Sequence, residues 1–370
     1  MLRKICRKIP RCRYKWASLI RHNNLPESSI YNEKIFEEPD IYWRLKGTWL
    51  WYYIIHQYYA QHIASSIAMW VKDFEPQVVW VLAEDKAVSV ALKLLEYMQK
   101  VQLHLTFHDA PEAYAEMFGK YKWPVRNMYL SAVNRLVEKA FSIDMVSPEL
   151  MAHMCHNFNV SSSCKTMCFP PSVDLSGIKN DHKSVTCNGP VKIGICGSPR
   201  ESKAQFQKFL AVLAGMKRPV ELIVYTDSES GYYDGLPGNV SLIKMLYAST
   251  EQELIRGFYE HGVVACYMGL PRDNRLFVTT SLSSKFPVYC ACGVPVIMNG
   301  PEYSVAGNYI KKAGCGVILS DQNEEAIGQL NQLFANALMH TSMSQASLKL
   351  CENDFDLNKN IQGFVDLISF

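Results

Sequence analysis

The sequence predicts an α/β protein made of two doubly wound, Rossmann-like domains. Two observations support this prediction. Buried strands alternate with helices from Val78 to Phe169, and the same alternation resumes at Val191, which is typical of parallel sheets covered on both faces. The chain also has 370 residues, which is more than one hydrophobic core usually holds.

The first half of the chain begins with a helical segment rich in aromatic residues, Thr48–Phe74, and alternation starts after it. Ser147 is a good N-cap and Pro148 suits the first helical position. The predicted strands are Val78–Leu82, Leu103–Phe107, Phe141–Val146 and Lys165–Phe169. The predicted helices are Ala87–Lys100, Ala110–Phe118, Val125–Ala140 and Pro148–Phe158.

The second half repeats this alternation after a polar, turn-rich linker, and its last residues are expected to be helical. The expected domains are 1–174 and 191–343, with a linker at 175–190 and a terminal helical segment at 344–370. The predicted strands are Val191–Cys196, Glu221–Tyr225, Asn239–Leu242, Gly262–Tyr267, Val294–Ile297 and Gly314–Leu319. The predicted helices are Ala204–Met216, Thr250–Gly257, a short one from Lys285, Ser304–Ala313 and Asn323–Leu338.

Composition excludes some classes of function. A net charge of +3 is too small to indicate a nucleic-acid partner. Basic residues gather before the first acid, Glu27, so residues 1–22 are either a segment that lies on an anionic membrane surface or a solvated tail. The 12 cysteines follow no disulfide spacing and no secretory leader is expected, so we predict a cytoplasmic protein with reduced thiols.

A polar loop precedes the short helix predicted from Lys285. Its hydroxyls and backbone N–H groups stand before a helix start, where unpaired donors and a partial positive charge favour an anion, above all phosphate. Gly293 suits a left-handed helix end, and Pro295 does not continue a helix. The residues expected to contact the anion are Thr280, Ser281, Ser283, Ser284 and Lys285.

A second phosphate site is predicted where the strand Val191–Cys196 runs into a loop and a helix. Gly197 allows a tight turn, and Arg200 and Lys203 bring two cations to the start of the following helix. A strand, a glycine loop and a helix in this order form a phosphate cradle.

At these residues the chain resembles the second half of retaining glycosyltransferases of the GT-B fold, family 4-like. That family carries a polar loop, a lysine, a tyrosine and then A-x-G-x-P-V-I. The matching residues here are Ser284, Lys285, Tyr289, Ala291, Gly293, Pro295, Val296 and Ile297. The two glutamates of the family motif are replaced by Thr280 and Val288, and Ser198 stands at the usual arginine position before the matching Lys203.

The resemblance implies a GT-B protein, two Rossmann-like domains facing a cleft, whose terminal helix crosses back to the first domain. It implies transfer of a sugar, with retention and without a metal, from a nucleotide-diphosphate sugar to a glycan or lipid-linked acceptor in polysaccharide or glycoconjugate synthesis. No permanently bound cofactor is expected. Lys203 and Lys285 would stabilise the leaving diphosphate, Tyr289 or backbone groups would hold the ribose, and His108 and Asp109 would lie near the transferred sugar.

Other functions stay open. Loss of both glutamates and of a glycine-rich turn at the front favours a degenerate GT-B protein that binds a nucleotide or a partner enzyme, and a sugar-nucleotide epimerase is a third reading. No paired carboxylates support a glycosidase. The nearest approach to a metal motif is Asp227-Ser228-Glu229 in a turn-rich stretch, and the His and Cys residues between His153 and Cys168 lack paired spacing for zinc.

Overall fold

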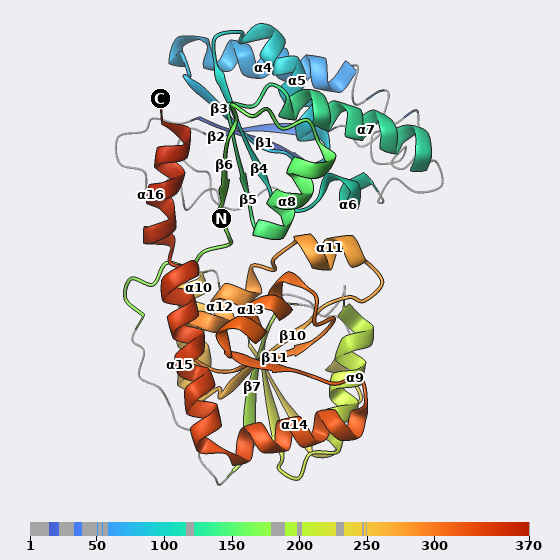
Figure 1. The fold of residues 1–370 in the computed structure, drawn as a ribbon, viewed down its shortest axis with the longest axis vertical. Coiled ribbons are helices and arrows are strands. Elements are labelled where there is room, and N and C mark those ends of the chain that lie inside the picture. The colour runs from blue at the N-terminus through green and yellow to red at the C-terminus, as the bar shows by residue number, and fades with distance from the viewer. Residues whose placement is uncertain are drawn as a thin grey trace. The chain divides into compact units, whose positions relative to one another are not determined.

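The chain forms two α/β units in a computed structural model (Figure 1). The first unit comprises residues 1–169 and 361–370, and the second comprises residues 170–360. The structure describes residues 15–21, 33–38, 50, 54, 58–115, 122–178, 189–197, 202–226, 233–245, 248 and 250–369. In these residues no helix is long and apolar enough to cross a membrane.

The first unit alternates strands and helices from β3 onward, as predicted. Its strands are β1 (Trp16–Arg21), β2 (Glu33–Glu38), β3 (Val78–Leu82), β4 (Gln102–Phe107), β5 (Ser142–Met145) and β6 (Lys165–Cys168). Its helices are α4 (Ala60–Val71), the 3₁₀ turn η3 (Lys72–Phe74), α5 (Lys86–Tyr97), α6 (Pro111–Ala115), α7 (Lys122–Val137), α8 (Pro148–Asn157) and the end of α16 (Leu357–Ile368).

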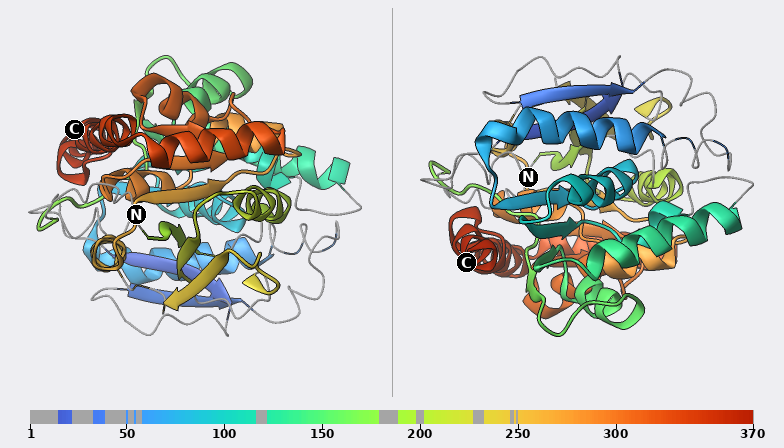
Figure 2. Two further views of the ribbon diagram at one scale, coloured as in Figure 1. Left: turned by 90° about the horizontal axis from the view of Figure 1, so that it is seen from below. Right: turned by 90° about the horizontal axis from the view of Figure 1, so that it is seen from above.

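Strands β1 and β2 were not predicted, and they form a parallel pair of their own. Phe36 of β2 is buried and its ring meets Trp70 of α4 edge-on at 6.4 Å. Figure 2 shows α4 between this pair and α5. Residues 16–21 of the predicted membrane-surface segment are therefore a paired strand, and the rest of that segment, apart from Lys15, lies outside the described residues. Four of the six residues of β2 are charged, so its strand pattern is weak, whereas β1 was assigned to the basic segment.

Strands β3 to β6 form a four-stranded parallel sheet in sequential order. One face carries buried polar groups: His104 contacts Ser142 Oγ through Nδ1 and Asp144 Oδ1 through Nε2, each at 2.8 Å. Thr106 donates to the same carboxylate and accepts from Trp80 Nε1 at 2.7 Å. Because polar groups without water need partners, this network fixes the register of β3, β4 and β5.

Helix α16 packs on this polar face through Phe364, which is fully buried. Its ring centroid lies 4.7 Å from Trp80, 5.2 Å from His104 and 5.4 Å from Phe169. The last ten residues of the chain therefore belong to the first unit, although they follow the second in sequence.

The second unit is also a parallel α/β structure. Its strands are β7 (Val191–Cys196), β8 (Val220–Tyr225), β9 (Val240–Met245), β10 (Ala265–Gly269), β11 (Val296–Asn299) and β12 (Gly316–Ile318). Its helices are α9 (Lys203–Ala214), α10 (Glu251–His261), α11 (Arg275–Thr280), α12 (Lys285–Ala291), α13 (Val305–Ala313), α14 (Asn323–Ala335), α15 (Ala337–Asp354) and the start of α16.

The six strands follow the order β12-β11-β10-β7-β8-β9. Strands are therefore added on one side of β7 first and on its other side from β10 onward, so the strand order reverses between β7 and β10. Alternate strand residues enter two separate cores. Cys266 and Met268 pack with α10 and α12 on one face, whereas Ile193, Ala265 and Tyr267 pack with α9 and α14 on the other. Both units are thus parallel α/β structures, as predicted, and the described strands of the second unit show the reversed order of a doubly wound sheet.

Capping residues set several helix ends where the sequence analysis was wrong. Thr250 forms a capping box with Glu253, and α10 continues to His261 before Gly262 takes a left-handed φ of 71°. The predicted strand from Gly262 therefore starts at Ala265. The predicted helix Asn323–Leu338 ends at Ala335, because the Asn336 side chain accepts from Met339 N–H and starts α15.

We predict that Phe364→Ala destabilises the first unit by about 3–5 kcal/mol, because it removes a fully buried ring and leaves a cavity beside Trp80. Denaturant unfolding monitored by tryptophan fluorescence measures this change. Leu338→Ala is the control, because Leu338 is 85% exposed and its truncation should change stability by less than about 0.5 kcal/mol. Equal effects of the two variants would contradict the packing of α16.

Candidate functional site

The carboxyl end of β7 turns sharply at Gly197, which has a left-handed φ of 75°. Three contacts hold this turn. Cys196 N–H donates to the Tyr289 hydroxyl at 2.8 Å, and Gly197 N–H donates to the Tyr225 carbonyl at 2.7 Å. The Tyr233 hydroxyl donates to the Gly197 carbonyl at 3.3 Å. The turn is therefore fixed by tyrosines from β8, α12 and the segment before β9.

Lys285 brings a cation to this turn. It is the first residue of α12, and a Cβ placed on Gly197 would lie 3.3 Å from both Cε and Nζ of Lys285. Only glycine combines the left-handed φ with a close approach of the lysine. The structure thus joins Gly197 and Lys285, which lie 88 positions apart in the sequence (285 − 197).

An open pocket lies at the same place, with an empty volume of about 590 Å³ that includes open solvent. It sits at the carboxyl ends of β7 and β10, between which the strand order reverses, and ligands of doubly wound sheets bind at such a point. The pocket is lined by Ile195, Cys196, Gly197, Ser202, Tyr267, Met268, Gly269, Leu270, Pro271, Phe277, Ser283, Lys285 and Tyr289.

Four residues predicted from the sequence line this pocket: Gly197, Ser283, Lys285 and Tyr289. The Ser283 hydroxyl accepts from the Lys285 N–H at 3.4 Å. Tyr289 is fully buried, burial raises the pKa of its hydroxyl, and that oxygen accepts the N–H of Cys196. In this structure Tyr289 therefore supports the Gly197 turn, whereas the sequence analysis suggested a ribose contact.

Other predicted residues lie outside the pocket lining. Thr280 was expected in a loop, but it ends α11, where its hydroxyl donates to the Leu276 carbonyl at 2.7 Å. The Asn274 side chain caps this helix, which the sequence analysis missed. Ser284 is exposed, and so is Lys203 at the start of α9. Ser198 and Arg200 lie outside the described residues.

Ser281 stands between α11 and α12 with a buried hydroxyl. This oxygen has no hydrogen-bond partner among the described residues. A buried polar atom without a partner costs stability unless a ligand or water satisfies it. Ser281 is not among the residues that line the pocket, so its role in anion binding stays a prediction.

His108 and Asp109 follow β4 in the first unit, whereas the pocket belongs to the second unit. His108 Nδ1 lies 3.5 Å from Glu84 Oε1. Its Nε2 is buried and has no hydrogen-bond partner in the described part of the chain. Burial lowers the pKa of His108, although the carboxylates of Asp144 and Asp109 oppose the shift. Glu84 was not singled out by the sequence analysis.

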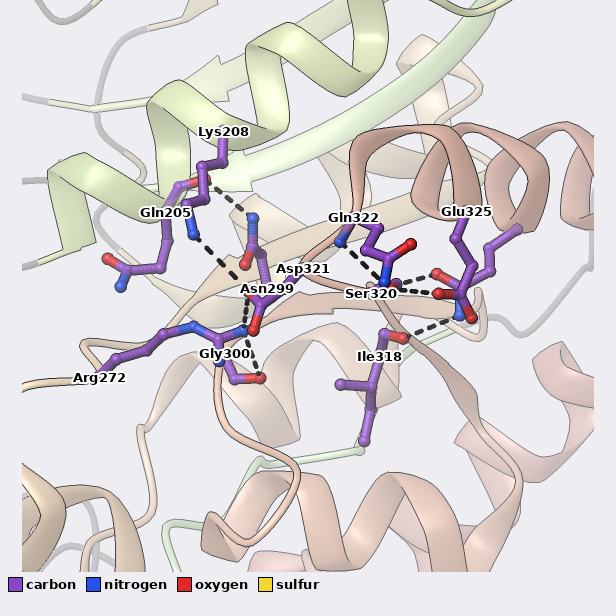
Figure 3. A network of polar contacts seen from close by, with 11 residues as sticks. Gln205, Lys208, Arg272, Asn299, Gly300, Ile318, Ser320, Asp321, Gln322 and Glu325 are labelled. Carbon is purple, nitrogen blue, oxygen red and sulfur yellow. Dashed lines mark hydrogen bonds and ion pairs between the residues drawn. The ribbon is translucent and has the colours of Figure 1, made fainter.

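A polar network holds the loops that follow β10, β11 and β12 (Figure 3). Arg272 pairs with Asp321 at 2.8 Å, and Asp321 also pairs with Lys208 of α9 at 3.6 Å. Buried Asn299, at the end of β11, donates to the Gln205 carbonyl at 3.0 Å. These contacts fix the segment that continues from Leu270 and Pro271, which form one wall of the pocket.

Among the described residues, no group of three or more His, Cys, Asp or Glu side chains is placed to hold a metal ion. His153, one of the residues weighed for zinc, instead contacts both carboxylate oxygens of Glu112 at 3.1 Å. The stretch Asp227-Ser228-Glu229 lies outside the described residues.

No family model matches the chain, and no curated protein matches it in sequence. Solved structures do match. The E. coli trehalose-6-phosphate protein bound with UDP-2-fluoro glucose has a TM-score of 0.62 and 12% identity, covering 96% of this chain and 92% of that one. Anabaena HepE in complex with UDP-glucose has a TM-score of 0.61 and 12% identity, with 90% and 85% covered.

Sucrose-phosphate synthase from Thermosynechococcus elongatus has a TM-score of 0.58 and 12% identity, with 82% of this chain and 76% of that chain covered. The matching structures are GT-B glycosyltransferases. The chain therefore has the GT-B fold, as the sequence resemblance implied.

We predict that Tyr289→Phe lowers the free energy of unfolding by about 1–3 kcal/mol, because Cys196 N–H then loses its partner in a part-buried place. Chemical denaturation of the wild type and of Tyr289→Phe measures this change in the free energy of unfolding. Tyr303→Phe is the matched control, because Tyr303 is 48% exposed. If Tyr289→Phe were as stable as the control, the hydroxyl would not hold the turn.

We also predict that acidification through pH 6.5, the ordinary pKa of histidine, destabilises the first unit partly through His108. Burial lowers the folded-state pKa, so the unfolded chain binds the proton first and the stabilisation present above pH 6.5 is lost as pH falls. Denaturant midpoints between pH 7.5 and pH 5 should fall less steeply in His108→Gln than in the wild type. Exposed His156→Gln should keep the wild-type slope.

Proposed function

We propose that this chain is a glycosyltransferase that binds the diphosphate of a nucleotide-sugar donor beside Gly197 and Lys285. The observation that carries the proposal is the position of the Lys285 side chain over the left-handed Gly197 turn, at the strand-order switch point. A cation and a backbone turn at the carboxyl ends of parallel strands suit a phosphate group. The related fold in HepE is solved with UDP-glucose.

The chemistry asks little of other side chains. When the bond between the sugar and the diphosphate breaks, negative charge grows on the leaving group. A cation already in place stabilises the transition state more than the ground state. We assign this role to Lys285, with Ser283 and Ser281 as hydroxyl donors and Lys203 as a second cation. By analogy with a single oxyanion donor, removing Lys285 should cost about 3 kcal/mol of transition-state stabilisation.

The acceptor and the stereochemistry are part of the proposal, and they rest on the sequence resemblance. We propose a glycan or lipid-linked acceptor, transfer with retention and without a metal, and a cytoplasmic role in polysaccharide or glycoconjugate synthesis. The basic segment before residue 22 would contact an anionic membrane surface. His108 and Asp109 would serve the acceptor side. His108 is half-buried and its pKa is lowered by burial, so its imidazole is neutral near pH 7 and can accept a proton.

A second candidate function is nucleotide or partner binding without catalysis. Val288, at the position of a family glutamate, is buried in the core, and Thr280, at the other, gives its hydroxyl to its own helix. Neither side chain offers a carboxylate to a ribose or a sugar, and this observation favours a degenerate protein.

Nucleotide binding tests the proposed site. Calorimetry with UDP, GDP, CMP and ADP should show that one of them binds. Binding should fall by about a hundredfold in Lys285→Ala and further in the Lys203→Ala, Lys285→Ala double variant, since charge-assisted contacts are worth about 1.5–3 kcal/mol each. Lys312→Ala, on the exposed face of α13, is the control.

Turnover separates the two candidate functions. An enzyme should release nucleotide from the sugar nucleotide whose base binds, and Lys285→Ala should slow that release by about 10²–10³-fold. A degenerate protein would bind the nucleotide without turning it over. If folded wild-type protein bound none of the nucleotides, the proposed donor site would be wrong.

A further inference from the structure

Tyr267 of β10 has a buried hydroxyl that the described protein does not use. The side chain is 3% exposed and lines the pocket. Its ring stacks on Phe209 with centroids 3.8 Å apart and an interplanar angle of 11°. The hydroxyl oxygen has no hydrogen-bond partner among the described residues. Such an atom is costly to bury, so its presence calls for an explanation outside the packing of the core.

Gly269 leaves the space beside this hydroxyl open. A Cβ at Gly269 would lie 2.8 Å from Ser202 Oγ and 3.1 Å from the Tyr267 hydroxyl oxygen. All three residues line the pocket. The glycine thus allows two hydroxyl groups, from α9's N-cap and from β10, to approach the bare backbone at the pocket wall.

The pocket lining has a cationic part and an apolar part. Its cation is Lys285, over the Gly197 turn. The segment after β10 adds an apolar wall of Leu270 and Pro271, and Phe277 of α11 lines the same pocket. Phosphate oxygens suit the cation, whereas a flat heterocycle with a few polar edge atoms suits apolar walls and a single hydroxyl. Tyr267 lies on the strand that leads into this apolar wall.

We propose that the Tyr267 hydroxyl binds the polar edge of the donor's nucleoside and that Tyr267 is a specificity-determining residue of the pocket. This inference rests on the proposed nucleotide-sugar function. A ligand that offers a hydrogen-bonding atom satisfies the buried hydroxyl, whereas a ligand without one leaves it unpaired, and discrimination of that kind is large in buried sites. Burial raises the pKa of Tyr267, so the hydroxyl keeps its proton near neutral pH and can donate it.

The stability of the unliganded protein provides an independent test of this role. A phenylalanine ring would pack on Phe206 and Phe209 as the tyrosine ring does, and it would remove the unpaired hydroxyl. Tyr267→Phe should therefore be as stable as the wild type or more stable without ligand, while its nucleoside binding is weaker. A hydroxyl that served the fold alone would give the opposite pair of results.

The test compares the wild type, Tyr267→Phe and the control Tyr303→Phe in calorimetry with the nucleoside diphosphate that binds most tightly and with inorganic pyrophosphate. Thermal unfolding without ligand is measured in parallel. We expect Tyr267→Phe to lose about tenfold in affinity for the nucleoside diphosphate, to keep its pyrophosphate affinity, and to keep or raise its Tm. Lys285→Ala should weaken both ligands, which identifies the phosphate end separately.

Three results would overturn the inference. Unchanged nucleoside diphosphate affinity in Tyr267→Phe would show that the hydroxyl makes no contact with the nucleoside. Equal losses for the nucleoside diphosphate and pyrophosphate would assign Tyr267 to the phosphates or to the fold, and a lower Tm would favour the fold. If the folded wild type bound pyrophosphate at least as tightly as every nucleoside diphosphate, the nucleoside site and the proposed function would both fail.

Discussion

The reversal of strand order between β7 and β10 is the constraint on which the rest of the second unit depends. The chain runs from β7 to β8 on one side of the sheet centre and from β10 to β11 on the other side. The segments that follow β7 and β10 therefore diverge. The space between them holds the pocket, with Gly197 from one strand end and Gly269 from the other. Lys285 and Tyr289 enter the same place from α12.

The short helix α12 joins the core of the second unit to its candidate site. Its buried face includes Phe286 and Tyr289 in the core that α10 and α15 complete. Because Tyr289 is fully buried, its hydroxyl has a fixed position, where it accepts the Cys196 N–H. The position of the Gly197 turn is thus determined by core packing, and the first residue of the same helix carries the cation that lies over the turn.

The first unit depends on a different interaction, the buried pairing of His104 with Asp144. His104 and Asp144 lie on neighbouring strands, and Ser142 and Thr106 add hydrogen bonds to them. The other carboxylate oxygen of Asp144, Oδ2, is buried without a partner among the described residues. The ring of Phe364 covers the face. A buried pair of this kind is weak evidence for stability by itself, but it favours one strand register over alternatives that would leave charges unpaired. At the carboxyl end of β4, the same sheet presents His108.

The sequence by itself determined the two parallel α/β units, because strand and helix periods, caps and glycines are local properties. Ser147 and Thr250 cap the predicted helices, and Gly293 has the expected positive φ. The sequence analysis missed β1, which it assigned to the basic segment, and β2, in which four of six residues are charged. Only the tertiary structure decided that Lys285 lies over Gly197, that Tyr289 supports the turn, and that Tyr267 has a buried hydroxyl in the pocket. These relations join residues far apart in the chain, so they depend on how the elements pack and on no local pattern.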